Sequence, residues 1–256
     1  MQNTSEIDMT DRKESRSKVK FFNLSIDVLN SQGFFRELQQ CLSKDHNVSI
    51  NFLNAHCFNT AQKNDKYKNA LERCTFLLND GVGVNIAGKL IGVRFKENMN
   101  GTDLIPQMIR FFASNKMTLF CFGAKKEVIE KAVANIEADY PGLSVVGYSD
   151  GYVEDPATIV DQINLSQADA VILGLGVPRQ ELWVENHGAR LNSVRVLVSG
   201  GAIFDFISGN VVRAPLFIRR IKLEWLFRLV QEPGRLFSRY VIGNFLFFYY
   251  VVTRRN

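Results

Sequence analysis

The chain has 256 residues, of which 46% are apolar and 22% charged, as is ordinary for a globular protein that buries a core in one large domain or in a domain with an appendage. Its formal net charge is +5 and its pI is about 9.0, which would suit a nucleic-acid partner. However, residues 211–256 carry nine Lys/Arg against two acids, so the rest of the chain is net negative. Because the surplus charge lies in one tail, we expect no nucleic-acid binding.

Cysteine and histidine usage gives no sign of a disulfide framework or a metal centre. The four cysteines (Cys41, Cys57, Cys74 and Cys121) are widely spaced without a C-x-x-C pair, so we expect reduced thiols in a cytosolic protein. The three histidines lack the spacing of zinc ligands, and we predict no metal site. Residues 1–18 are polar and lack the apolar segment of a signal peptide, so we expect a disordered tail.

From residue 19 onward, short apolar runs alternate with segments of helical periodicity. The predicted strands are 19–22, 48–53, 75–78, 118–122, 144–147, 170–173 and 194–198. The predicted helices are 33–43, 57–73, 82–91, 103–114, 126–139, 156–165 and 179–187. Several strands are continuous apolar runs, which is typical of strands buried on both faces. The alternation predicts a Rossmann-like, doubly wound α/β domain with a mainly parallel sheet over residues 19–210.

Polar residues stand at the starts of two predicted helices. Asp80 directly follows the strand at 75–78, so its carboxylate either faces a ligand crevice as a base or caps the next helix. Asn100-Gly101-Thr102-Asp103 precedes an amphipathic helix. Thr102 or Asp103 is the expected N-cap there, and the same helix end would suit a phosphate or a sugar.

Glycines follow three predicted strands, at Gly123, at 174–176 and at 200–201. Open α/β sheets bind ligands at these carboxyl ends of their strands. After Gly174-Leu175-Gly176 a helix begins, where a diphosphate would be favoured, and Gln180 and Glu181 could bind the polar edges of a nucleotide. A complete G-x-G-x-x-G is missing and no G-x-x-x-x-G-K-[ST] occurs. A nicotinamide dehydrogenase is therefore poorly supported, and a P-loop kinase is excluded.

The alternation stops near residue 211, and residues 211–256 form a helical, basic and aromatic appendage. Arginine interleaved with large apolar groups suits a membrane leaflet or a lipid-linked phosphate. The apolar run 245–252 is shorter than the about 20 residues that cross a bilayer, so we expect a cytoplasmic protein with peripheral membrane contact. No D-x-D motif occurs in the folded region. The guanidinium groups of Arg228, Arg235 and Arg239 are predicted either to replace a metal at a diphosphate or to form a solvated basic face.

Taken together, these segments resemble the WecG/TagA/CpsF family of bacterial glycosyltransferases (glycosyltransferase family 26). The resemblance runs in order through nearly the whole folded chain, at residues 52–56, 79–83, 100–104, 174–181, 200–206, 213–215, 223–229, 232–235 and 239–240. It departs from the family pattern at three positions. Phe52 stands in place of the threonine of a Thr-x-Asn element, Asn79 in place of a proline, and Ser238 in place of a basic residue.

The resemblance implies an inverting, metal-independent enzyme without a cofactor. It would be a UDP-sugar-dependent hexosyltransferase that forms a β-1,4 linkage to a sugar on undecaprenyl diphosphate. The product would belong to an exopolysaccharide or another cell-surface glycan, and the enzyme would lie at the cytoplasmic face of the inner membrane. The motifs at 52–56 and 78–81 look more like the GumM-like exopolysaccharide members than the teichoic-acid ManNAc transferases. UDP-glucose, UDP-glucuronate, UDP-ManNAc and UDP-ManNAcA stay open as donors.

The resemblance also implies that Asp80 is the base that deprotonates the acceptor hydroxyl and that the appendage closes over the active site. The predicted catalytic residues are Asp80, Arg228 and Arg235. The predicted substrate-binding residues are Asn54, His56, Gly81, Asn100, Thr102, Asp103, Gly174, Gly176, Gln180, Glu181, Gly201, Arg213 and Arg239.

Two other classes of function stay open. A non-catalytic UDP-binding scaffold of a membrane polysaccharide complex would bind the nucleotide without transfer and would tolerate substitution of Asp80. A nucleic-acid binder would follow from the pI alone, but the sequence has no recognition-helix or aromatic-platform motif to support it. The apolar surface of the appendage also favours a homo-oligomer.

Overall fold

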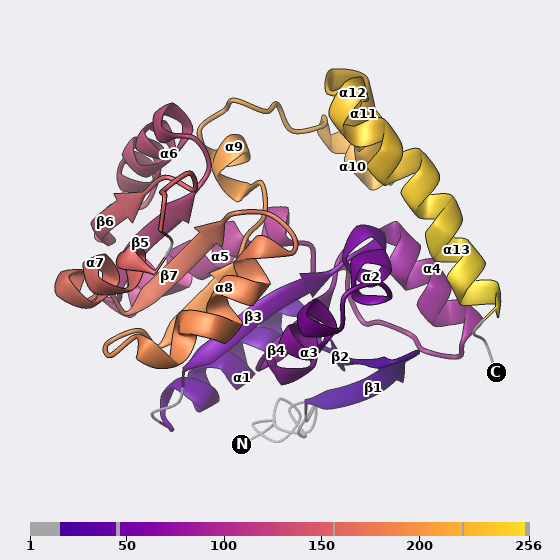
Figure 1. The fold of residues 1–256 in the computed structure, drawn as a ribbon, viewed down its shortest axis with the longest axis horizontal. Coiled ribbons are helices and arrows are strands. Elements are labelled where there is room, and N and C mark those ends of the chain that lie inside the picture. Colours follow the sequence, from indigo (N-terminus) through magenta and orange to yellow (C-terminus); the bar gives the residue numbers. More distant parts are fainter. Residues whose placement is uncertain (1–15, 45–46, 156, 222, 254–256) are drawn as a thin grey trace, which may run out of the picture.

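A single eight-stranded sheet runs through the molecule with helices on both of its faces (Figure 1). The computed structural model describes residues 16–44, 47–155, 157–221 and 223–253, apart from the side chain of Arg235. The strand order is β1-β2-β4-β3-β8-β7-β5-β6. Strands β1 and β2 pair antiparallel, and every other pair is parallel. The predicted α/β class with a mainly parallel sheet is confirmed.

The elements of the sheet domain alternate as the sequence predicts. The strands are β1 (Ser17–Phe21), β2 (Leu24–Val28), β3 (Val48–Leu53), β4 (Phe76–Asn79), β5 (Thr118–Gly123), β6 (Ser144–Ser149), β7 (Ala170–Gly174) and β8 (Val196–Ser199). The helices are α1 (Ser31–Leu42), α2 (Ala55–Ala61), α3 (Asp65–Arg73), α4 (Val82–Leu90), α5 (Gly101–Ser114), α6 (Lys126–Asp139), α7 (Thr158–Ser166), α8 (Arg179–His187), the 3₁₀ turn η1 (Gly188–Arg190) and α9 (Ile203–Ile207).

The appendage is helical, as predicted. It consists of α10 (Leu216–Arg220), α11 (Glu224–Gln231), α12 (Pro233–Phe237), a π-helical turn η2 (Ser238–Ile242) and α13 (Gly243–Thr253). Within the described residues, no helix is long and apolar enough to cross a bilayer. Residues 1–15 of the expected N-terminal tail lie outside the described residues, and Ser17 and Lys18 belong to β1.

Three local predictions are wrong. Strand β2 was not predicted, because the turn Phe22-Asn23 places Phe22 at φ 56° without the Asn-Gly signal of a two-residue hairpin. The predicted helix 57–73 is two helices, since Asn64 caps α3 by accepting a hydrogen bond from the backbone N–H of Tyr67 at 3.0 Å. The N-cap of α5 is Asn100, whose Oδ1 accepts from the backbone N–H of Asp103 at 2.9 Å, and not Thr102 or Asp103.

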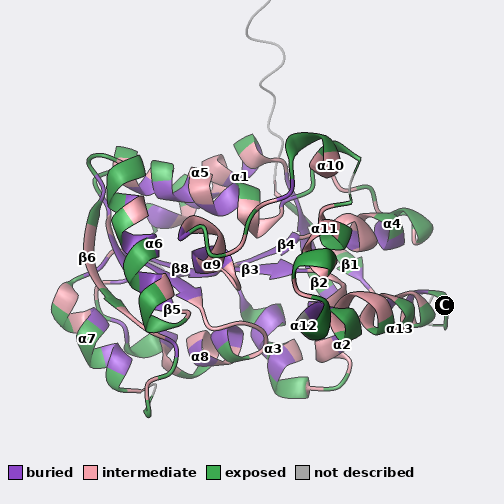
Figure 2. Ribbon diagram, turned by 90° about the horizontal axis from the view of Figure 1, so that it is seen from above, coloured by how far each residue is buried: buried purple, intermediate pink, exposed green. Residues whose placement is uncertain are grey.

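Buried residues concentrate on the sheet and on the inner faces of the helices (Figure 2). Helices α1, α5, α6 and α9 cover one face, with Phe34, Phe112 and Phe204 at its centre. Helices α2, α3, α4, α7 and α8 cover the other. Helix α13 joins this second layer, because Phe247 and Val251 are buried against α2 and α4. The last helix therefore fastens the appendage to the domain.

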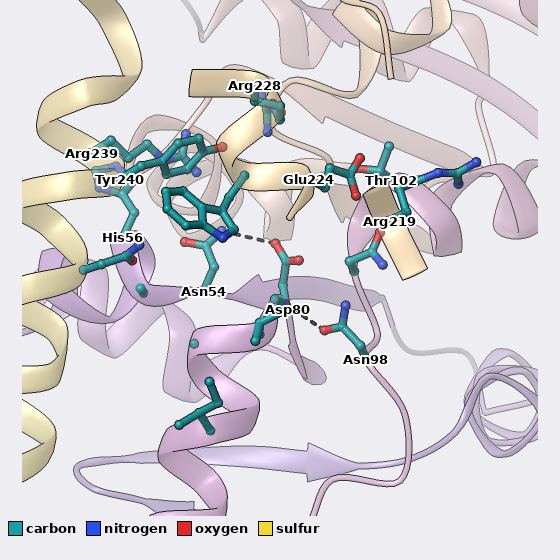
Figure 3. Close-up of a pocket in the computed structure, with 18 of the residues that line it drawn as sticks. Asn54, His56, Asp80, Asn98, Thr102, Arg219, Glu224, Arg228, Arg239 and Tyr240 are labelled. Atoms are coloured by element: carbon teal, nitrogen blue, oxygen red, sulfur yellow. Dashed lines mark hydrogen bonds between the residues drawn. The ribbon is translucent and has the colours of Figure 1, made fainter. Parts of the chain in front are cut away.

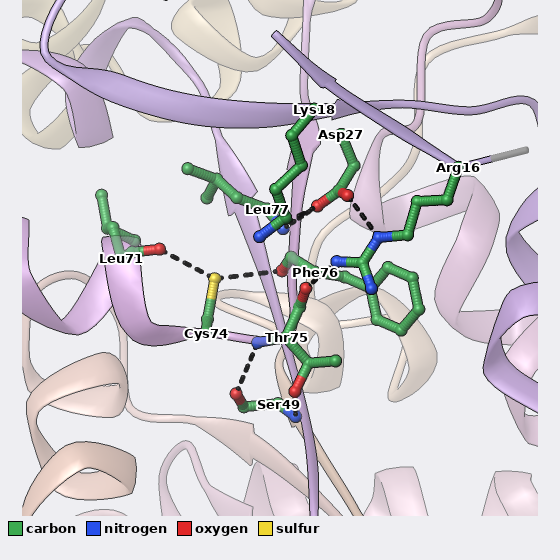
Figure 4. A network of polar contacts seen from close by, with 9 residues as sticks. All are labelled: Arg16, Lys18, Asp27, Ser49, Leu71, Cys74, Thr75, Phe76 and Leu77. Carbon is green, nitrogen blue, oxygen red and sulfur yellow. Dashed lines mark hydrogen bonds and ion pairs between the residues drawn. The ribbon is translucent and has the colours of Figure 1, made fainter. Parts of the chain in front are cut away.

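Asp27 fastens the N-terminal hairpin to the parallel sheet (Figure 4). Its side chain is fully buried, and its Oδ2 accepts a hydrogen bond from the backbone N–H of Leu77 at 2.9 Å. Its Oδ1 accepts from Nε of Arg16 at 2.6 Å, and the guanidinium of Arg16 also covers the ring of Phe76. Because β2 meets β4 in register at Asp27, the carboxylate supplements the backbone ladder at this junction.

Replacing Asp27 by alanine should lower the free energy of unfolding by about 3 kcal/mol, because it leaves a buried N–H and a half-buried guanidinium without their acceptor. Urea denaturation followed by circular dichroism measures this change. Lys20→Ala, at an exposed position of the neighbouring strand β1, is the control and should stay within about 0.5 kcal/mol of the wild type. Equal effects of the two substitutions would contradict this role of Asp27.

Candidate functional site

Two adjoining cavities lie at the carboxyl ends of the parallel strands. The first, of about 590 Å³, lies between α4, the loop that leads into α5, and the appendage, and we call it the tail cavity. The second, of about 360 Å³, lies against the ends of β5, β7 and β8 and the start of α8, and we call it the glycine cavity. Five residues line both: Asn54, Asp80, Thr102, Arg228 and Arg239. Asp80 thus stands where the two cavities meet.

The sheet places Asn54 beside Asp80. Strands β3 and β4 run parallel with Leu53 opposite Asn79, so the residues that follow them lie next to each other. The amide Nδ2 of Asn54 donates to Oδ2 of Asp80 at 3.2 Å (Figure 3). The amide oxygen of Asn54 accepts the backbone N–H of Cys57 as the N-cap of α2, which fixes its N–H₂ group toward Asp80. Asp80 itself caps no helix, since Gly81 begins α4 without a side-chain cap.

The loop at residues 97–99 holds the backbone around Asp80. The buried amide of Asn79 donates to the carbonyl of Glu97 at 2.8 Å, and the carbonyl of Asn79 accepts from the backbone N–H of Met99 at 3.0 Å. Asn98 accepts from the backbone N–H of Gly81 at 2.8 Å (Figure 3). Asn79 therefore anchors one wall of the tail cavity, which a proline at this position could not do. Neither Asn79 nor Asn98 was predicted as a site residue, because Asn79 was known only as a departure from the family pattern and no motif includes Asn98.

Burial raises the pKa of Asp80 above its usual range. The hydrogen bond from Asn54 and the positive charges of Arg239 and Arg228 lower the pKa of Asp80, and Glu224 raises it further. A desolvated carboxylate with raised proton affinity, open to two cavities, has the properties of a general base. Such a group accepts a proton from a hydroxyl more readily than an exposed aspartate does.

Two arginines of the appendage converge on the same junction from above (Figure 3). Arg228 comes from α11 and lies 4.9 Å from the ring centroid of Phe206, whereas Arg239 comes from η2 and lies beside Tyr240. The Nε atom of each is buried without a hydrogen-bond partner within the described part of the chain. Guanidinium groups with unpaired N–H donors suit an anion with several oxygens, such as a diphosphate. The side chain of Arg235 lies outside the described residues, and its catalytic role stays a prediction.

Arg213 has a different place from the one expected of a substrate-binding residue. It is not among the residues that line either cavity. Its Nη2 lies 2.6 Å from Oδ1 of Asp103, and its Nε lies 3.3 Å from Oε1 of Glu224. Arg219 lies 3.7 Å from the same oxygen of Asp103. These ion pairs tie the appendage to the start of α5, where Asn100 also donates to Asp103.

His56 lines the tail cavity close to Arg239. Burial, aided by the charge of Arg239, lowers the pKa of His56 to about 4. The imidazole is therefore neutral near pH 7, and it offers a hydrogen-bonding group without a charge. Trp225, Tyr240 and Phe248 complete the aromatic side of this cavity. These three residues were not assigned to the site from sequence, because aromatic residues in a basic tail are equally consistent with a membrane surface.

The glycine cavity contains the motif that follows β7. The amide oxygen of Gln180 accepts from the backbone N–H groups of Gly176 at 3.3 Å and Gly201 at 2.9 Å, so it joins two loops. A Cβ at Gly174 would lie 2.4 Å from the ring of Phe204, so only glycine fits there. Gln180 Nε2 donates to Oε1 of Glu181 at 2.9 Å, and burial raises the pKa of Glu181 to about 7. The loops thus offer bare backbone to a ligand.

The structure brings most of the predicted site residues together at these two cavities. Asn54, His56, Asp80, Gly81, Asn100, Thr102, Asp103, Arg228 and Arg239 line the tail cavity, and Gly174, Gly176, Gln180, Glu181 and Gly201 line the glycine cavity. The described residues include no group of three or more His, Cys, Asp or Glu that could hold a metal ion. The arrangement joins a buried carboxyl group, two guanidinium groups whose Nε atoms are unpaired within the described residues, and loops of glycine.

Comparison with known proteins gives a consistent result. The model of the family described as "Glycosyl transferase WecG/TagA/CpsF family" matches residues 19–256. A relative from Bacillus spizizenii is 38% identical over 175 residues, 68% of each chain, and one from Bacillus subtilis is 36% identical over 186 residues, 73% of this chain and 72% of the relative. A relative from Staphylococcus aureus is 26% identical over 192 residues, 75% of each chain.

All three relatives carry the name N-acetylglucosaminyldiphosphoundecaprenol N-acetyl-beta-D-mannosaminyltransferase. The predicted closer likeness to the GumM-like exopolysaccharide members is therefore corrected, since the likeness lies with ManNAc transferases. The prediction rested on short variants at 52–56 and 78–81, which weigh less than identity over two thirds of the chain.

Replacing Arg239 by glutamine should raise the pKa of Asp80 further, because it removes a positive charge that favours the carboxylate. Arg239→Lys keeps the charge and should leave the pKa near that of the wild type. Carboxyl ¹³C chemical shifts of labelled aspartate, measured as a function of pH, give the titration midpoint of Asp80 directly. Equal midpoints in the two variants would show that the charge of Arg239 does not act on Asp80.

Proposed function

The chain belongs to the WecG/TagA/CpsF family of glycosyl transferases, and from this membership we propose that it transfers N-acetylmannosamine from a UDP donor to N-acetylglucosaminyl diphosphoundecaprenol. The names of the relatives support the sugar and the acceptor. One observation carries the assignment of the site: Asp80 lines both cavities, so a single carboxylate serves acceptor and donor. The acceptor sugar would occupy the tail cavity, and the nucleotide the glycine cavity.

The proposed reaction is a single displacement. Asp80 takes the proton of the acceptor hydroxyl, O4 in our proposal, and the oxygen attacks the anomeric carbon from the face opposite UDP. The new C–O bond forms as the bond from the anomeric carbon to the diphosphate breaks, which inverts the configuration and gives a β linkage from an α-linked donor. Asn54 orients the carboxylate during this step. A positioned base of this kind typically contributes about 10²–10⁴-fold to the rate.

Arg228 and Arg239 would stabilise the leaving diphosphate. Negative charge on the departing oxygen develops only in the transition state, so donors aimed at that oxygen lower the barrier without tightening ground-state binding equally. Their unpaired Nε groups support this role. We propose that these arginines, with Arg235, take the place that a divalent cation has in other nucleotide-sugar sites, so that transfer is metal-independent.

Replacing Asp80 by asparagine should lower turnover at least about 100-fold while UDP still binds, because the amide keeps the shape of the side chain but accepts no proton. Radiolabelled transfer from UDP-ManNAc to the prenyl-diphosphate acceptor gives the rate, and calorimetry gives the affinity for UDP. Asp161→Asn, an exposed position of α7, is the matched control.

This variant also separates the proposal from a non-catalytic scaffold that binds UDP. Turnover of Asp80→Asn close to that of the wild type would remove Asp80 from the role of base. Absence of transfer in the wild type with every candidate donor, together with retained UDP binding, would favour the scaffold. UDP-glucose, UDP-glucuronate and UDP-ManNAcA assayed beside UDP-ManNAc test the identity of the sugar.

We further propose that residues 19–210 form the catalytic domain and that residues 211–256 bind the cytoplasmic leaflet of the inner membrane peripherally. Helix α13 supports this division, because one face is packed on the domain while the opposite face is exposed. The exposed stripe consists of Phe245, Tyr249 and Val252, preceded by the exposed Ile242 at the end of η2, and Phe245 and Val252 are 75% and 71% exposed. An apolar stripe on a basic segment is typical of helices that lie in an anionic membrane surface.

Replacing Phe245, Tyr249 and Val252 together by serine should weaken binding to anionic phospholipid vesicles at least about ten-fold, because the stripe loses its apolar area. Vesicle co-sedimentation measures the partition. Leu165→Ser, at a residue of α7 that is 84% exposed, is the control and should bind as the wild type does. Equal partition of both variants would place membrane binding elsewhere.

A further inference from the structure

Glu181 is a buried acid, and one of its carboxyl oxygens, Oε2, has no hydrogen-bond partner among the described residues. It is the third residue of α8, lines the glycine cavity and is 2% exposed. Its Oε1 accepts the hydrogen bond from Gln180, while its Oε2 is buried and unpaired within the described part of the chain. The ionisable groups that face it are the thiol of Cys57 on α2 and the hydroxyl of Tyr67 on α3.

The neutral acid fits this position better than the carboxylate does. Among the described residues, no Lys, Arg or His nitrogen lies within ion-pair distance of Glu181, so an ionised carboxylate would be a buried charge without a counterion. As an acid, Glu181 carries a hydrogen on Oε2 that still needs an acceptor, and the residues that the structure describes offer none. The pKa of about 7, which burial causes, means that both forms occur near neutral pH.

A second unpaired hydroxyl lies in the same cavity. Ser199, at the end of β8, is 3% exposed, and its Oγ has no partner in the described structure. The cavity also contains the start of α8, the glycine loops and the guanidinium groups of Arg228 and Arg239. Lys125 lines the cavity as well, and so do the carboxyl groups of Asp80 and Asp205. The three cations suit a ligand with negatively charged oxygens.

We propose that Glu181 binds the sugar nucleotide in its protonated form and, in the cavity that Ser199 also lines, donates its Oε2 hydrogen to an oxygen of the donor diphosphate, so that donor binding takes up a proton. This inference rests on the proposed function. A bound diphosphate repels a carboxylate and attracts an acid, so occupancy of the cavity and protonation of Glu181 favour each other.

The sign of the pH dependence follows from this linkage. Below pH 7 Glu181 is already protonated and the donor binds fully, whereas above pH 7 each binding event must add a proton. The affinity should therefore fall about 30-fold between pH 6 and pH 8.5, with uptake of about half a proton at pH 7.

The pKa of Cys57 is raised to about 12, that of Tyr67 is raised well above its usual value, and that of His56 is lowered to about 4, so these three stay neutral throughout this range. Asp80 lines the same cavity and its pKa is also raised, so a variant is needed to distinguish proton uptake by Glu181 from proton uptake by Asp80.

The test is calorimetric titration of the full chain with UDP-ManNAc, without acceptor, at pH 6, 7 and 8.5 in pairs of buffers that differ in ionisation enthalpy. UDP-ManNAc is the right probe because its diphosphate is a diester that does not titrate in this range. Glu181→Gln donates a hydrogen at every pH and should bind with little pH dependence and without proton uptake. Glu185→Gln, on the same helix but paired with Arg73, should behave as the wild type.

Each outcome supports or overturns the inference that Glu181 is protonated when the donor is bound. Proton uptake that persists in Glu181→Gln, or binding to the wild type without uptake, overturns the inference and leaves the proposed function intact. Failure of the wild type to bind UDP-ManNAc at any pH overturns both this inference and the proposed function. If Glu181→Gln does not fold, difference infrared spectra of the wild type still decide: donor binding at pH 8 should add the carbonyl stretch of a carboxylic acid, and its absence overturns the inference.

Discussion

The hydrogen bond from Asn54 to Asp80 depends on one feature of the sheet, the parallel pairing of β3 with β4. Because both strands end at the same level, the two side chains meet at the edge where the cavities join. Asn54 uses its oxygen to begin α2 and its N–H₂ group to hold Asp80, so helix initiation and orientation of the carboxylate depend on the same amide. A shift of register between these strands would separate the pair and remove the carboxylate of Asp80 from both cavities.

The appendage divides its arginines between two tasks. Arg213 and Arg219 pair with Asp103 and thereby attach α10 and the segment before it to the domain. Arg228 and Arg239 have buried Nε atoms above Asp80 without a partner in the described part of the chain. Arg219 takes part in both tasks, because its Nε is likewise buried and unpaired there and it lines the tail cavity. Composition alone does not distinguish these tasks, since all four residues look alike in sequence.

The fold was predictable from the sequence because buried parallel strands and amphipathic helices each have a periodicity of their own. Strand β2 escaped prediction because its turn contains Phe22 where glycine or asparagine is usual. The motifs around Asp80 and Gln180 indicated the correct edge of the sheet, since residues after parallel strands meet there. The sequence could not predict the contacts of Asn79 and Asn98 at the cavity wall or the ion pairs of Arg213. These interactions join segments that are far apart in the chain. The predicted likeness to the GumM-like members was wrong, since a few substituted motif positions weigh less than identity over two thirds of the chain.

Helix α13 gives the appendage a part in the folding of the domain. Phe247 belongs to the same buried cluster as Phe21 and Phe58, which come from the first strand and the second helix. The side chain of Asn59 also donates to the carbonyl of Gly243 at 2.7 Å. During synthesis, this layer of the core therefore stays open to solvent until Val251 has left the ribosome. The walls of the tail cavity and the helix with the exposed apolar stripe would then form in one cooperative event, so that deleting the appendage would also disturb the core of the sheet domain.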